Sequence, residues 1–274
     1  MEYNDGIVIY ADDTVIICTS KTVISAKEKI NNTLLHIDNY CKNNLLFLNT
    51  SKSKIMIFPH TKSILFDNYF FLNNNTLEIV NEYTYLGYPI DNKLKFKEVI
   101  NKLSIKLKGC NYMLQRMRPL FPKSVLYLIF NALGQSYLIY YKSILYVLSP
   151  NQVKPIKTLI LHSSAIIDNC LLKYVSNKQI NYDFIIDYYL SIYLFKIFKL
   201  GFSPCLYKFQ NKPHSYLTRS RKELYINVSN SNLISKSFSY YAPNKLNAIP
   251  SHLISMENNN MFKKMLKKHL LEVK

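Results

Sequence analysis

The stretch IVIYADDTVII, residues 7–17, places two adjacent aspartates between two runs of apolar, mostly β-branched residues. Such runs on either side of a short polar segment predict a β-hairpin with Asp12 and Asp13 at its apex. Holding two like charges beside a buried sheet costs free energy, which a divalent cation removes. Mg²⁺ prefers such hard oxygen ligands, together with substrate phosphates. The stretch therefore favours a metal site for phosphoryl or nucleotidyl transfer, and two ordinary turn-forming aspartates are the alternative.

Charge points to a polyanionic partner. Lys and Arg outnumber Asp and Glu by 35 to 17 over 274 residues, which gives a formal net charge of +18. Such an excess favours nucleic acid as the partner, and an anionic membrane surface is the competing target. With 49% hydrophobic residues, the chain is long enough and apolar enough for one large domain or two ordinary ones.

The cysteines argue against a disulfide framework and against a zinc site, because they are odd in number, scattered and never in a C-x-x-C pair. They are Cys18, Cys41, Cys110, Cys170 and Cys205. A reducing compartment fits this pattern. The first residues include Glu2 and Asp5, unlike a signal peptide. We therefore expect an intracellular, non-secreted protein, nuclear or cytoplasmic.

One segment tests the membrane alternative. Residues 124–141 carry no charge over 18 positions, close to the length of a membrane-spanning helix. Asn131, Gln135 and several tyrosines interrupt the segment, however, and its apolar residues recur on one side of a helix. We expect a buried helix of a globular domain and no membrane partner.

The hydrophobic pattern predicts an α+β fold. After the hairpin, residues 22–44 have helical spacing, and short strands are expected at 45–49, 54–58 and 83–88. From residue 94 onward the spacing is typical of helices, expected at 94–117, 123–148, 150–167, 183–199 and 261–273. The section 214–251 is basic and rich in expected loops.

Five short motifs occur in a familiar order. They are Tyr10-Ala11-Asp12-Asp13, Asn49 to Lys54 followed by Met56-Ile57-Phe58, Tyr85-Leu86-Gly87, Arg116-Met117-Arg118, and a tail with Thr218-Arg219, residues 237–243 and residues 246–250. In this order they resemble the C-terminal part of reverse transcriptases from non-LTR retrotransposons, especially the jockey-like and related LINE groups. The resemblance covers nearly the whole chain.

The resemblance implies a partial polymerase palm, an antiparallel sheet with a helix, followed by a mostly helical thumb and C-terminal region. It assigns residues 1–92 to the C-terminal part of the palm, 93–170 to a thumb-like domain, and 171–274 to a helical and loop-rich region. Two departures stand out. The family's other metal-binding aspartate, its fingers and its common endonuclease domain would all precede Met1, and Leu246 replaces a frequent tryptophan. We expect a truncated copy, or a gene model begun at an internal methionine.

The activity implied is RNA-templated DNA synthesis with two Mg²⁺ ions, in which a primer hydroxyl attacks a deoxynucleoside triphosphate and pyrophosphate leaves. Asp12 and Asp13 would coordinate metal, and Tyr10 would approach the primer terminus. Lys52 would lie near the triphosphate, with a solvated turn lysine as the alternative. Because the metal ligand set is incomplete, we expect no polymerase activity from this chain alone.

Further residues would hold the nucleic acid. By resemblance, Tyr85, Leu86 and Gly87 form a turn against the primer backbone. The phosphate backbone of an RNA–DNA duplex would contact the basic residues Lys95, Lys102, Lys106, Lys108, Arg116 and Arg118. A solvated helix face is the plainer interpretation of the lysines. The alternative function is a non-catalytic remnant that binds RNA or RNA–DNA hybrid.

Overall fold

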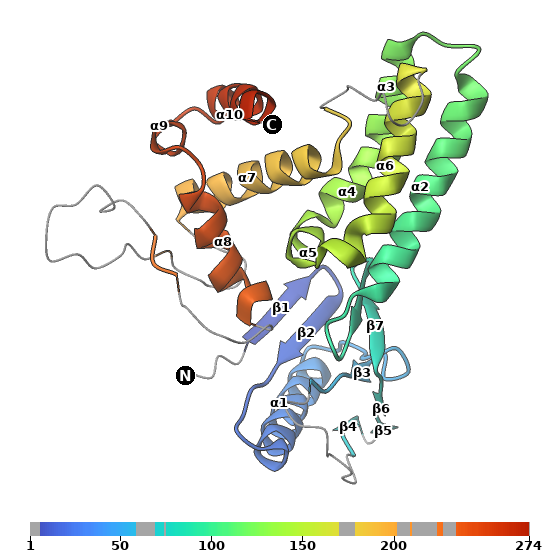
Figure 1. Ribbon diagram of the computed structural model, residues 1–274. Helices are drawn as coiled ribbons and strands as arrows, with labels where there is room; N and C mark the ends of the chain where they lie inside the picture. The colour runs from blue at the N-terminus through green and yellow to red at the C-terminus, as the bar shows by residue number, and fades with distance from the viewer. Residues whose placement is uncertain are drawn as a thin grey trace, which may run out of the picture. The chain divides into compact units, whose positions relative to one another are not determined.

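The computed structural model shows an α+β protein, with 61% of the described residues in helices (Figure 1). It describes residues 6–58, 69–73, 75–169, 179–201, 209, 224–226 and 234–273. Its contacts divide the chain into unit 1, Met1–Lys95, and unit 2, Phe96–Lys274. The small sheets belong to unit 1 and the long helices of unit 2 follow them, as the hydrophobic pattern predicts.

Unit 1 begins with the expected hairpin. Strand β1, Gly6–Tyr10, pairs antiparallel with β2, Asp13–Ile17. Helix α1, Val23–Asn43, follows, and its first turn is capped by Thr22, whose side chain accepts from the backbone N–H of Ser25. Leu34 of α1 is buried with three residues of the following loops and strands, Phe70, Leu72 and Leu77. Ile16 of β2 packs against the same cluster, so the hairpin is attached to the core of unit 1.

The strand expected at 45–49 is wrong. Leu45 adopts a left-handed backbone with φ 56°, and its N–H donates to the carbonyl of Lys42. The N–H of Leu46 donates to the carbonyl of Cys41 at 2.8 Å. These two bonds form a Schellman motif, which ends α1 and uses the backbone groups that a strand would need. The expected strand 54–58 is shorter than predicted and covers only β3, Lys54–Ile55.

The described residues form four separate two-stranded ladders. Besides β1–β2, β3 pairs parallel with β6, Glu78–Ile79, while the other two ladders are antiparallel. Their strands are β4, Phe71–Leu72, with β5, Asn75–Thr76, and β7, Glu82–Tyr85, with β8, Tyr88–Asp91. The strand region predicted at 83–88 is confirmed in part: β7 covers its first residues, and the chain turns at Leu86 and Gly87 before β8 begins.

In unit 2, helices α2, Lys97–Met117, and α6, Pro150–Asp168, confirm two predicted helices and pack side by side (Figure 1). Their facing sides supply fully buried aliphatic residues, among them Leu103, Leu107 and Ile156. A buried polar link joins them as well. Asn111 donates to the carbonyl of Leu159, and the hydroxyl of Ser163 donates to Asn111 Oδ1 at 2.5 Å.

The single helix predicted over 123–148 is divided into four pieces. They are α3, Lys123–Phe130, a π-helical turn, Asn131–Gln135, then α4, Ser136–Tyr140, and α5, Lys142–Val147. The π-turn coincides with Gly134, where a β-carbon would lie 2.9 Å from the ring of Phe130. The sulfur of Cys110 in α2 would lie 3.2 Å from the same β-carbon, so the absence of a side chain at residue 134 leaves room for both neighbours.

The C-terminal helices share one core. Helix α7, Tyr182–Leu200, and α10, Asn259–Val273, extend the predicted helices by a few residues. Between them lie α8, Phe238–Asn247, within the section 214–251 predicted to be rich in loops, and α9, Ser251–Ile254, at its end. Leu246, at the position where the resembling family often has tryptophan, is fully buried there.

No described helix is both long enough and apolar enough to cross a membrane. The segment 124–141 instead forms α3, the π-turn and α4, with Phe130 and Leu138 fully buried. Among the described residues, Cys18, Cys41 and Cys110 form no disulfide. Cys170 and Cys205 lie outside the described residues.

Candidate metal centre and nucleic-acid surface

The two aspartates lie at the tip of the β1–β2 hairpin. Tyr10 pairs with Asp13, so the turn consists of Ala11 and Asp12 alone. Both carboxylates are exposed, and within the described residues neither has an ion pair or a side-chain hydrogen bond. Two exposed carboxylates on adjacent residues, with no ion pair among the described residues, are hard oxygen donors open to a cation.

The turn itself is strained. Ala11 has φ 53°, a left-handed conformation that L-residues other than Asn, Asp and Gly seldom adopt. Positive φ at the first central position alone matches the φ pattern of a type II′ hairpin turn, in which glycine is usual. Backbone strain of this kind, of order 1–3 kcal/mol, clusters at binding and catalytic sites.

The donor set fits part of a magnesium site. Mg²⁺ commonly takes one or two protein carboxylates and completes its shell with water and substrate phosphates, and Asp12 and Asp13 supply such a pair. Among the residues that the structure describes, no group of three or more His, Cys, Asp or Glu side chains gathers into a metal site. A two-metal centre needs further oxygen donors beyond this pair.

Lys52 lies in an exposed turn organised by Asn49. The side-chain oxygen of Asn49 accepts from the hydroxyl of Ser51 at 2.7 Å and from the backbone N–H of Lys52 at 3.2 Å. The spacing from Asn49 to Lys52 in the motif that resembles the polymerase palm is thus also the spacing of a local turn. Lys54, the other lysine of this motif, instead pairs with Glu78 across the β3–β6 ladder at 2.6 Å.

Tyr85, Leu86 and Gly87 form the turn of the β7–β8 hairpin. Tyr85 pairs with Tyr88, and both central residues have positive φ, 47° at Leu86 and 80° at Gly87. This is the φ pattern of a type I′ turn, which asparagine and glycine favour. Leucine in this conformation is strained, while glycine accepts it readily. The hydroxyl of Tyr85 is buried and has no hydrogen-bond partner among the described atoms.

The basic residues of α2 do not form one patch. Lys102 and Lys106 are one turn apart and share a flank, and Arg116 lies near the same side. Lys108 is two residues beyond Lys106 and therefore projects from the opposite flank. The ammonium of Lys106 lies 5.6 Å from the ring centre of Tyr137.

The two remaining basic residues predicted to bind nucleic acid have local partners. The guanidinium of Arg118 donates to Asn169 Oδ1, which connects the C-terminal ends of α2 and α6. The backbone N–H of Lys95 donates to the carboxylate of Asp91 at 3.0 Å. Lys95 is the last residue of unit 1, and its side chain is exposed.

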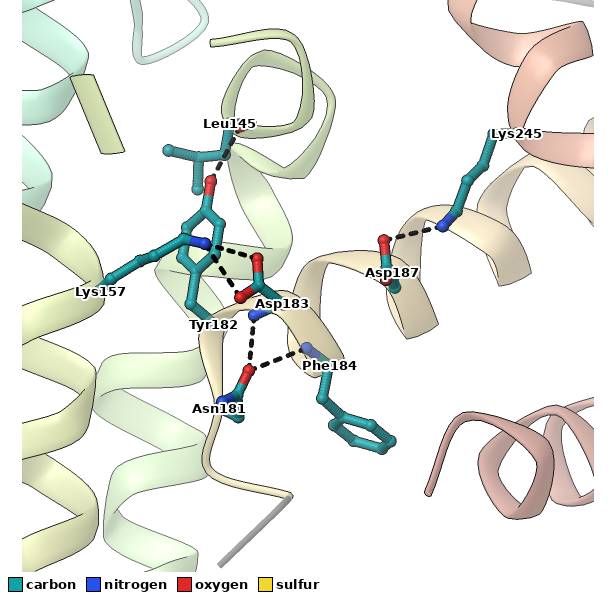
Figure 2. Close-up of polar contacts among 8 residues, drawn as sticks. All are labelled: Leu145, Lys157, Asn181, Tyr182, Asp183, Phe184, Asp187 and Lys245. Atoms are coloured by element: carbon teal, nitrogen blue, oxygen red, sulfur yellow. Dashed lines mark hydrogen bonds and ion pairs between the residues drawn. The ribbon is translucent and has the colours of Figure 1, made fainter. Parts of the chain in front are cut away.

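A second cluster of charged groups surrounds the start of α7 (Figure 2). Lys157 pairs with Asp183 at 2.7 Å, Lys245 pairs with Asp187 at 2.7 Å, and Tyr182 donates to the carbonyl of Leu145. Burial, reinforced by the two nearby aspartates, raises the pKa of Tyr182 above its usual range. Sequence reasoning placed α7 here but did not foresee these pairs, because their partners are distant in the chain.

The pocket beside this cluster is small, about 190 Å³, and is lined by α5, α6 and α7. Ligand pockets are usually larger, about 300–1,000 Å³. Its two carboxylates are already neutralised by lysines from neighbouring helices. The cluster therefore joins four helices, α5, α6, α7 and α8, and does not resemble a binding site for a small molecule.

Comparison of the chain with protein-family models, with curated proteins and with solved structures gave no match.

Proposed function

We propose that this chain carries part of the palm and thumb of an RNA-directed DNA polymerase of the non-LTR retrotransposon kind. The observation that carries the proposal is that Asp12 and Asp13, at the strained hairpin tip, are exposed and form no ion pair with any described residue. The five motifs that resemble this family in order supply the class of reaction. In this assignment residues 1–92 belong to the palm, 93–170 to the thumb and 171–274 to the C-terminal region.

The residues would divide the work as follows. Asp12 and Asp13 bind Mg²⁺, which supplies charge neutralisation for nucleotidyl transfer between a DNA primer and a deoxynucleoside triphosphate on an RNA template. Lys52, exposed in its turn, neutralises the triphosphate. Tyr10 and the strained turn 85–87 contact the primer end. Copying RNA into DNA implies an intracellular site of action, in the nucleus or cytoplasm.

A single carboxylate pair does not complete a two-metal site, so we propose that the chain alone does not polymerise. A third carboxylate from another segment or another chain would complete it. Mg²⁺-dependent primer extension by the purified chain, abolished by Asp12→Asn, would overturn this part of the proposal and strengthen the polymerase assignment itself.

Metal uptake tests the assignment directly. We expect the full chain to bind Mn²⁺ in the presence of an RNA–DNA primer–template and a deoxynucleoside triphosphate. Electron paramagnetic resonance measures this binding. Asp12→Asn and Asp13→Asn should each weaken uptake at least about tenfold, or 1.4 kcal/mol, because each removes one of two carboxylate ligands. Glu257→Gln is the matched control, since it removes an exposed acid far along the chain.

The second candidate is a non-catalytic binder of RNA or RNA–DNA hybrid, favoured by the net charge of +18 and by Lys102 and Lys106 on one flank of α2. The same experiment separates the two. Metal uptake that is equal in Asp12→Asn and in the control, together with salt-sensitive nucleic-acid binding, would leave the binder and reject the polymerase.

A further inference from the structure

Helix α10 carries a concentration of lysines that the polymerase assignment does not use. Lys263, Lys264, Lys267 and Lys268 form two pairs, each one helical turn apart. Among the described residues the acid beside them is Glu272, 3.8 Å from Lys268, while Lys263, Lys264 and Lys267 have no ion pair. The side chain of Lys268 is 70% exposed. The surface is therefore strongly positive and weakly neutralised.

The core of unit 2 fixes which side of α10 faces solvent. Phe262 and Leu266 are fully buried among α7, α8 and α9, and the rings of Phe262 and Phe195 stack at 3.8 Å. At 3.6 residues per turn, Lys264 and Lys268 project from the opposite side, and Lys263 and Lys267 from a flank. Their exposure agrees, since Lys264 and Lys268 are exposed and the other pair is half-buried.

The orientation of α10 favours one of the three partners that a basic helix can bind, which are an anionic membrane, an acidic protein and a nucleic acid. A basic amphipathic helix that lies on a membrane buries its apolar face among the lipids. In α10 that face, with Phe262 and Leu266, is already occupied by the protein core. The centre of a protein–protein interface is depleted in lysine, which also disfavours an acidic protein. Phosphates of a nucleic-acid strand need only the projecting ammonium groups.

We propose that the lysine surface of α10, residues 263, 264, 267 and 268, binds the phosphate backbone of single-stranded nucleic acid without reading its sequence. The proposal goes beyond the assigned polymerase chemistry, because none of these four lysines has a role in it and phosphate contacts need no metal. This lysine surface would hold the template strand on the chain without the metal ions that Asp12 and Asp13 are proposed to bind.

The test measures the salt dependence of binding. Fluorescence anisotropy of a short labelled single-stranded RNA is followed with the full chain in EDTA, from about 50 to about 200 mM salt. Lys264→Gln combined with Lys268→Gln should lower the slope of log affinity against log salt by about 1.4, since each lost phosphate contact on a single strand contributes about 0.7. Both side chains are exposed, so the fold should persist, as circular dichroism would verify.

A matched control removes the same charge elsewhere. The control combines Lys21→Gln with Lys154→Gln. Both lysines are exposed, Lys21 just before α1 and Lys154 in α6, and their loss should leave the slope unchanged. Equal slopes for both double variants, or no change in either, would overturn the proposal. Retained RNA binding with lost binding to phosphatidylserine-rich vesicles would overturn it in favour of a membrane. Because EDTA removes metal, failure here leaves the Mn²⁺ experiment on Asp12 and Asp13 unaffected.

Discussion

Single residues in left-handed backbone conformations mark the ends and turns that matter most in unit 1. Leu45 ends α1, Ala11 forms the turn beside the two aspartates, and Leu86 lies in the turn of the second hairpin. Glycine or asparagine would adopt these conformations with less strain. Ala11 and Leu86 fall in the motifs that resemble a polymerase, while Asn73 and Leu94 of the same unit also have positive φ and lie outside those motifs.

Gly134 in unit 2 has little room for a side chain. An added β-carbon would lie 2.9 Å from the buried ring of Phe130 and 3.2 Å from the sulfur of Cys110. Burial raises the pKa of the Cys110 thiol to about 11, so the thiol stays protonated at neutral pH and acts as a packing group.

We therefore expect Gly134→Ala to lower the free energy of unfolding by about 1–3 kcal/mol through overpacking. Gly109→Ala is the control, because a β-carbon there meets nothing within 4 Å. It should stabilise α2 by about 0.5–1 kcal/mol, since alanine is the better helix former. Urea denaturation measures both, and changes of the same sign would show that the close approach at Gly134 is not limiting.

At the scale of elements, α7 is tied to its neighbours by two ion pairs of different burial. Lys157 and Asp183 are 41% and 49% exposed, whereas Lys245 and Asp187 are 12% and 23% exposed. Asn181 also caps α7, accepting from the backbone N–H groups of Asp183 and Phe184 (Figure 2). The start of α7 is thus the point where α6, α7 and α8 are joined.

Removing one lysine from each pair should give different results. Lys245→Met leaves the Asp187 carboxylate without its cation in a mostly buried place, and should lower the free energy of unfolding by about 1–3 kcal/mol, less than for a fully buried pair. Lys157→Met affects an exposed pair and should change it by no more than about 1 kcal/mol. Similar denaturation midpoints for both variants would contradict the importance of burial at this joint.

At the scale of the whole molecule, the two units differ in how much they bury. Ile7, Ile9 and Tyr10 of β1 are 57%, 69% and 64% exposed, and within the described residues β1 pairs with β2 alone. An isolated hairpin is marginally stable, and an unpaired apolar edge favours association. By contrast, α2 and α6 bury Leu103, Leu107 and Ile156 completely.

Amide hydrogen exchange should reveal this difference. We expect peptides covering residues 6–17 to exchange orders of magnitude faster than peptides within α2 and α6, because local opening of the hairpin exposes little additional apolar surface. Mass spectrometry of the full chain measures both in one experiment. Equal protection of the hairpin and α2 would mean that β1 is covered by something other than the described contacts.

The sequence by itself determined the elements whose pattern is local. The hairpin at residues 6–17 and the helices α1, α2, α6, α7 and α10 follow from apolar periodicity, and the aspartates at the hairpin tip follow from their place between two β-forming runs. These features depend on neighbours within a few residues. The predicted metal, primer and template roles stay predictions, because no contact described here tests them.

Only the tertiary structure decided what depends on residues far apart in the chain. The approach of Gly134 to Cys110 of α2 accompanies the π-turn that divides the predicted long helix. The pairing of Lys54 with Glu78 leaves Lys52 as the exposed lysine of its motif. For α10, the sequence predicts only a basic amphipathic helix. Burial of Phe262 and Leu266 decides that its lysines, and not its apolar face, remain available to a partner.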